Sequence, residues 1–192
     1  MNPFKIIILF LLINTNLSAQ NSKAKHWVLG MELNVVDDDG RRPILAPKNF
    51  FNGLNFLPFP TAFSFEYYLK DNFSMELSES VNTYEVGEFV DGASNPKNIF
   101  FMALDFNAKY SFNSLYSSLS FSKKINWFDP YIMAGFGVTH RNAIVPTFNG
   151  GGGATFWVSK KIGINIQSMG KLSFSDKGSF YFQHLLGVKL KF

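Results

Sequence analysis

Ionisable side chains recur at alternate positions of several segments, separated by apolar residues. The clearest examples are Glu32, Glu66, Glu76, Asp105 and Lys109. In a β-strand, successive side chains point to opposite faces, so each of these residues shares a face with other polar groups. Enclosed carboxylates and ammonium groups persist only when they are paired and hydrogen-bonded. The pattern therefore predicts a polar, salt-bridged cluster on the inner face of a closed sheet.

Four further lysines fall on the same predicted face: Lys70, Lys171, Lys189 and Lys191. Two interpretations of the cluster remain open. Its ion pairs either rearrange and gate a narrow pore for small solutes or ions, or form a fixed plug that fills the interior. A barrel of eight strands is just wide enough for side chains to fill, which favours the plug.

Catalytic and cofactor chemistry has little support in the sequence. His26, His140 and His184 fall in different segments, whereas metal sites need clustered ligands. We therefore expect no metal and no cofactor. His140, beside Thr139 and Arg141, is the one candidate for a barrel enzyme that acts on outer-membrane lipid, but no serine–histidine motif accompanies it. We expect that the protein is not an enzyme.

The composition indicates a chain in which apolar and polar residues alternate, rather than one with long apolar runs. It holds 23 Phe among its 192 residues and is 17% aromatic. After Ile13, no stretch is apolar and long enough for a transmembrane helix. The net charge of +4 comes from scattered basic residues, so no nucleic-acid partner is expected. Cysteine is absent, which excludes disulfides.

Residues 1–20 have the layout of a secretory signal peptide. One lysine precedes the apolar run from Ile6 to Ile13, and small and polar residues follow it. Cleavage after Ala19 and cleavage after Gln20 both fit. We expect residues 21–192 to form one outer-membrane domain with both termini in the periplasm.

Apolar and polar residues alternate with a period of two in eight segments, each near the length that a tilted strand needs to cross a bilayer. Glu79 interrupts the apolar row of its segment. The eight segments are 27–36, 61–70, 73–82, 99–110, 129–139, 151–159, 162–171 and 180–192.

The connections between these segments should alternate in length. We predict long connections at 37–60, 84–98, 140–149 and 173–179, and short ones at 71–72 and 159–161. Segment 111–127 is the exception, a long connection where a short turn is expected. The weak alternation of "LYSSLSFS" within it leaves open the alternative that it extends a strand or adds one.

The last segment carries Val188, Leu190 and Phe192 on its apolar face. We expect this row to face lipid and to be recognised by the machinery that assembles outer-membrane barrels. The glycines in "GFG" and "NGGGG" are followed by alternating residues rather than by a helix, so a phosphate-binding loop is excluded. We expect them to make room beside a large inward residue such as Trp157, or to relieve curvature.

Several stretches together resemble the OmpA-like outer-membrane β-barrel of Bacteroidetes-type, Gram-negative bacteria. They are "WVLGMELNVVDDDG", "LPFPTAFSFEYYLKDNFSMELSESVN", "WFDPYIMAGFGVTHR", "NGGGGATFWVSKKIGINIQ" and "FYFQHLLGVKLKF". The resemblance covers nearly all of the chain after the signal peptide. It implies a barrel domain without the peptidoglycan-binding domain that often follows in this family, and it carries over no catalytic residues.

Pattern and resemblance agree on one fold class: an all-β, eight-stranded, antiparallel, up-and-down transmembrane β-barrel of the OmpA/OmpX-like type. The expected role is structural or interactive, with four extracellular loops outside a polar lumen. The expected partners are outer-membrane lipids, the barrel-assembly machinery and an unidentified extracellular partner of the loops.

Overall fold

The computed structural model describes residues 26–37, 54–87, 89–90, 93–112, 127–141, 143–174 and 180–192. The signal peptide predicted over residues 1–20 and most of segment 111–127 lie outside these residues.

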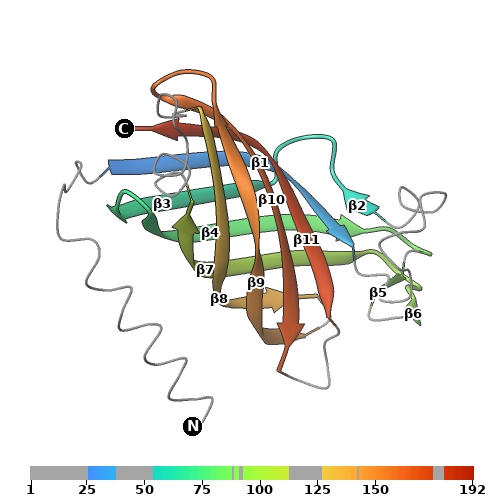
Figure 1. Cartoon of the computed structure of the whole chain (residues 1–192). Helices are drawn as coiled ribbons and strands as arrows, with labels where there is room; N and C mark the ends of the chain where they lie inside the picture. The colour runs from blue at the N-terminus through green and yellow to red at the C-terminus, as the bar shows by residue number, and fades with distance from the viewer. Residues whose placement is uncertain are drawn as a thin grey trace, which may run out of the picture.

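Eight long strands form a closed antiparallel barrel in which each strand pairs with its neighbours along the chain. The closing contact joins the first strand to the last, with Leu29 opposite Leu190. In Figure 1, β9 to β11 cross in front of β1, β3, β4 and β7, as tilted strands of a narrow barrel do. The eight strands are β1 (His26–Asp37), β3 (Ala62–Lys70), β4 (Phe73–Tyr84), β7 (Ile99–Ser111), β8 (Phe128–His140), β9 (Ile144–Trp157), β10 (Ile162–Ser173) and β11 (Tyr181–Lys191).

Three short strands lie at one end of the barrel. β2 (Leu54–Phe56) pairs with the end of β1, while β5 (Phe89–Val90) and β6 (Ala93–Ser94) form a small hairpin. We call this end, where β1 finishes and β11 begins, the loop end. The opposite end, where β1 begins and β11 finishes, is the terminal end.

The predicted eight strands are confirmed, but the predicted long connection at 140–149 is wrong. β8 ends at His140 and β9 already begins at Ile144. The glycine run of residues 150–153 lies inside β9 and pairs with both β8 and β10. Glycine has no side chain, so residues 150–153 show no apolar–polar alternation in the sequence. Within the described residues, no helix is long and apolar enough to cross a bilayer.

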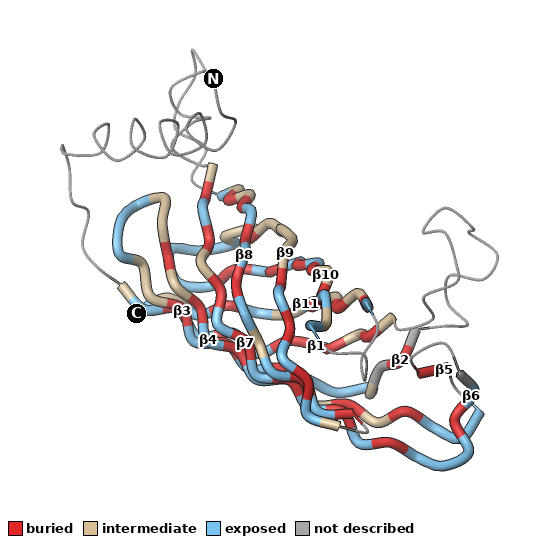
Figure 2. Tube along the Cα trace, turned by 90° about the horizontal axis from the view of Figure 1, so that it is seen from below, coloured by how far each residue is buried: buried red, intermediate tan, exposed pale blue. Residues whose placement is uncertain are grey.

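Burial alternates along the barrel strands, as the red and pale blue bands of Figure 2 show. The exposed residues are apolar: Phe106 is 51% exposed, Ile164 43% and Leu190 43%. The buried residues include most of the charged side chains of these strands. Apolar side chains therefore cover the outside and polar ones fill the inside, which confirms the predicted assignment of the two faces.

Candidate functional site

Four charged side chains from four strands meet inside the barrel. Lys189 Nζ lies 2.6 Å from Glu66 Oε2 and 2.9 Å from Glu76 Oε2. Lys109 Nζ lies 2.5 Å from the same Glu76 oxygen and 3.6 Å from the same Glu66 oxygen. Ser74 donates a hydrogen bond of 2.6 Å to the other oxygen of Glu66. We call Glu66, Glu76, Lys109 and Lys189 the luminal charge cluster.

The two other predicted members of the cluster are buried in the same interior but have different partners. Asn165 Nδ2 donates to Glu32 Oε1 over 2.6 Å. Asp105 pairs with Lys171, whose Nζ lies 2.5 Å from Oδ2, and Asn149 Nδ2 donates to Oδ1 over 2.9 Å. The five predicted polar residues are therefore all inside the barrel, but they divide among three sets of contacts.

The loop end of the interior is filled by apolar side chains. Phe101 packs edge-on against Tyr84 and Tyr181, with ring centroids 6.0 Å apart in both pairs. Val90, from the β5–β6 hairpin, is buried against the same group. We call this group the apolar cap; its members are Val36, Tyr84, Val90, Ile99, Phe101, Ala103 and Tyr181. The alternating pattern does not predict the apolar cap, because consecutive apolar residues in "VV" and "IFF" put apolar side chains on both faces of the strand.

Hydrogen-bonded amides and hydroxyls lie near the cap. Gln183 Nε2 lies 2.8 Å from both Asn34 Oδ1 and Ser80 Oγ. Thr139 Oγ1 and Tyr181 Oη are 2.6 Å apart, and the Arg141 guanidinium lies 4.6 Å from the centre of the Tyr181 ring. The interior is thus crossed by side-chain contacts from the charge cluster to the loop end.

Glycines provide the room that the large inward side chains need. A Cβ added to Gly153 would lie 2.7 Å from the Tyr131 hydroxyl oxygen, and one added to Gly137 would overlap Asp105. The Tyr131 hydroxyl lies 2.9 Å from Asn165 Oδ1 and 2.8 Å from Gln167 Oε1. Of the large inward residues, it is therefore Tyr131 that fills the space beside "NGGGG", rather than Trp157.

Two predicted inward lysines are not enclosed. Lys70 is exposed, because the β3–β4 register shifts between Tyr68 and Lys70 at the end of the strand. Lys191 is half-buried, and its Nζ lies 4.1 Å from the centre of the Trp157 ring at the terminal end.

The three histidines lie on three different strands, β1, β8 and β11. His140 is exposed, and within the described residues neither its side chain nor that of His184 forms a hydrogen bond. The register places Ser168 directly opposite His184 on the outer face, a pairing that the sequence analysis did not predict. In the part of the chain that the structure describes, no group of three or more His, Cys, Asp or Glu side chains could hold a metal ion.

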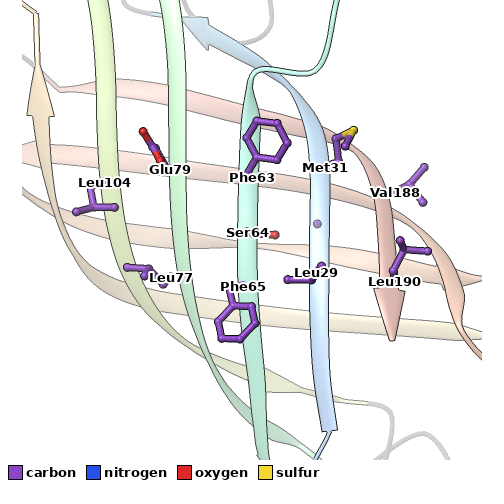
Figure 3. Close-up of a pocket in the computed structure, with 11 residues that line it drawn as sticks. Leu29, Met31, Phe63, Ser64, Phe65, Leu77, Glu79, Leu104, Val188 and Leu190 are labelled. Atoms are coloured by element: carbon purple, nitrogen blue, oxygen red, sulfur yellow. The ribbon is translucent and has the colours of Figure 1, made fainter. Parts of the chain in front are cut away.

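The outer face carries a groove of about 490 Å³ that is almost wholly apolar (Figure 3). Gly30 and Ser64, which are cross-strand partners, lie between its walls. Among the described residues that line it, Glu79 alone is ionisable, and it is exposed. The lining residues are Leu29, Gly30, Met31, Phe63, Ser64, Phe65, Leu77, Glu79, Leu104, Val188 and Leu190.

Comparison with solved structures defines the class of fold. The N-terminal β-barrel domain of Pseudomonas aeruginosa OprF matches with a TM-score of 0.56 and 13% identity, over 90% of this chain and 100% of that one. Neisserial surface protein A matches with a TM-score of 0.54 and 9% identity. Ail of Yersinia pestis matches with a TM-score of 0.50 and 11% identity. Both matches cover 90% of this chain and 100% of the other. The chain therefore has the eight-stranded barrel fold of these proteins.

At the level of sequence, no family model matches the chain, and no curated protein matches it either.

Proposed function

We propose that this protein is an integral outer-membrane barrel with a structural and surface-interaction role. The observation that carries the proposal is the polarity of the barrel: apolar side chains outside and ion pairs inside. Soluble barrels such as lipocalins have the opposite polarity. An apolar exterior of this extent is stable in hydrocarbon and unfavourable in water. The OmpA-like relationship of Bacteroidetes type belongs to the same proposal and rests on the sequence stretches quoted above.

The proposed orientation has both termini in the periplasm and the loop end outside. Two short connections, 71–72 and 158–161, lie at the terminal end, although the β8–β9 connection at the loop end is also short. The connection that contains the β5–β6 hairpin lies at the loop end. Short periplasmic turns and longer extracellular loops are typical of bacterial barrels, which supports this orientation. The loop end would then carry the surface that contacts an extracellular partner.

The interior supports a closed plug more strongly than an open pore. The luminal charge cluster joins β3, β4, β7 and β11 across the interior, and the apolar cap closes the loop end. A catalytic role is not part of the proposal, because His140 and His184 lack a hydrogen-bonded nucleophile among the described residues.

A narrow gated pore is the second candidate. It is favoured by buried polar atoms that have no hydrogen-bond partner among the described residues, because such groups are normally satisfied by ordered water. Examples are Glu76 Oε1, Asn107 Nδ2, Gln167 Nε2 and Gln183 Oε1.

Two measurements test the proposal. Heat-modifiable gel migration of outer-membrane fractions is expected, because a folded barrel migrates differently from the unfolded chain. In planar bilayers, the purified protein is expected to show no steady openings. Steady openings that change in the Glu66→Gln variant would show that the interior is a pore and not a plug. Recovery of the processed chain in the soluble fraction would overturn the membrane proposal itself.

Replacing Phe192 by serine is expected to lower the amount of assembled barrel in cells several-fold, while refolding of the purified chain into detergent stays nearly unchanged. The Phe192 side chain is 66% exposed, so it contributes little to packing, yet it continues the outward row of Val188 and Leu190. Gel migration of membrane fractions measures assembly. Leu172→Ser is the control, since Leu172 is also outward and 51% exposed but lies on β10. Equal losses in the two variants would contradict an assembly role for the last strand.

A further inference from the structure

One carboxylate lies on the apolar outer face, well inside its strand. Glu79 is the seventh of the twelve residues of β4, and its register partners are Phe63 on β3 and Leu104 on β7. Leu77 precedes it on the same face. Within the described residues, the Glu79 side chain forms no hydrogen bond and no ion pair. An ionisable group at membrane depth is expensive and is normally retained for a function that supplies it with a partner.

The groove beside Glu79 has a polar end and an apolar body. Figure 3 shows Glu79 and Leu104 on one side of the groove, on β4 and β7, and Val188 and Leu190 on the other, on β11. Phe65 and Leu29 lie between the two sides and are cross-strand partners. A ligand that fills this space would therefore place a polar group at Glu79 and hydrocarbon along the rest. The volume falls within the range of small-molecule sites.

We propose that this groove binds one hydrocarbon chain of a cationic amphiphile whose amino group pairs with Glu79. The inference rests on the membrane location proposed above. In hydrocarbon, attraction between apolar surfaces supplies little specificity, because lipid tails are as apolar as leucine. A carboxylate–ammonium pair in a low dielectric supplies it, since each charge removes the cost of leaving the other unpaired.

Other occupants fit less well. A second copy of the chain would bring a second Glu79 carboxylate or more apolar side chains, and neither complements a negative charge. An anionic amphiphile would place two negative charges together, and an alcohol would supply only a neutral hydrogen bond.

Trp27 provides the readout, because its ring stacks on Phe65 of the groove with centroids 4.5 Å apart. The chain has three tryptophans, so a Trp127→Phe, Trp157→Phe background leaves Trp27 as the single fluorophore. This protein is reconstituted into phosphatidylcholine vesicles. A long-chain alkylamine with bromine on its chain is added as the quenching probe, and the brominated alcohol and carboxylate of the same length serve as comparison probes.

The amine is expected to quench Trp27 at about a tenfold lower mole fraction in the bilayer than the alcohol. This is roughly a tenfold higher affinity, and we attribute it to the pairing of the ammonium group with Glu79. Glu79→Gln is expected to remove this difference and to leave quenching by the alcohol unchanged. Glu85→Gln makes the same chemical change at an exposed acid beyond the end of β4 and is expected to keep the preference.

Equal quenching by amine and alcohol in the Glu79 protein, or a preference that survives Glu79→Gln, would overturn the inference. A cross-linked dimer that forms in the same vesicles and disappears in Glu79→Gln would also overturn it, by assigning the groove to a second copy. Heat-modifiable migration is recorded on each sample. If the barrel inserts but shows no preference for the amine, only the proposed groove ligand is refuted. If the barrel fails to insert, the proposed function is refuted as well.

Discussion

Replacing Lys189 by methionine is expected to lower the free energy of unfolding by about 3–5 kcal/mol, as removal of one partner from a buried ion pair does. Lys189 is 1% exposed and contacts both carboxylates of the luminal charge cluster. Without it, only Lys109 faces Glu66 and Glu76. Those two carboxylates are cross-strand partners, so their mutual repulsion adds to the loss.

Urea unfolding of the barrel in detergent micelles or vesicles measures this change. Lys160→Met is the matched control, because Lys160 is exposed in the β9–β10 connection and a surface substitution changes stability by about 0.5 kcal/mol or less. Adding Glu66→Gln to Lys189→Met is expected to restore part of the stability, since it removes one unpaired carboxylate. A loss below about 1 kcal/mol for Lys189→Met, the range of surface pairs, would show that the cluster is solvated rather than buried.

The fold could be predicted from the sequence wherever both faces of a strand carry side chains. The alternation predicts segments 61–70 and 162–171 almost to their ends, because Phe, Leu and Ile alternate there with Glu, Asn and Gln. It predicts the start of β9 seven residues too late. Its glycines hide the alternation, and Pro146 looks like a loop residue although it pairs with Val138 within the sheet.

For the candidate site, the sequence predicts which residues point into the barrel but not which of them are in contact. Alternation places Glu66, Glu76 and Lys109 on the inside, but it does not say which charges touch. That depends on register and on which strands face each other across the interior. Lys189 and Glu66 are 123 residues apart and lie on β11 and β3, which are not neighbours in the sheet. No local sequence spacing encodes such a contact.

The second large effect is expected on the outer face of the barrel. Replacing Ile166 by lysine is expected to lower the free energy of unfolding in lipid vesicles by about 2–4 kcal/mol, the cost of a lysine that faces lipid near the bilayer midplane. Ile166 is 52% exposed and lies near the middle of β10. Because this side chain points outward, the loss comes from placing an ammonium group in hydrocarbon.

Ile162→Lys is the matched control for this prediction. Ile162 is on the same strand and face and is 43% exposed, but it begins β10 at the terminal end. A lysine there reaches the membrane–water interface, where the expected loss is only about 0–1 kcal/mol. The difference between the two variants therefore measures depth in a bilayer rather than a change in packing. Equal stability of both variants in vesicles would mean that water surrounds the barrel, and the apolar outer face would then need a protein partner instead of lipid.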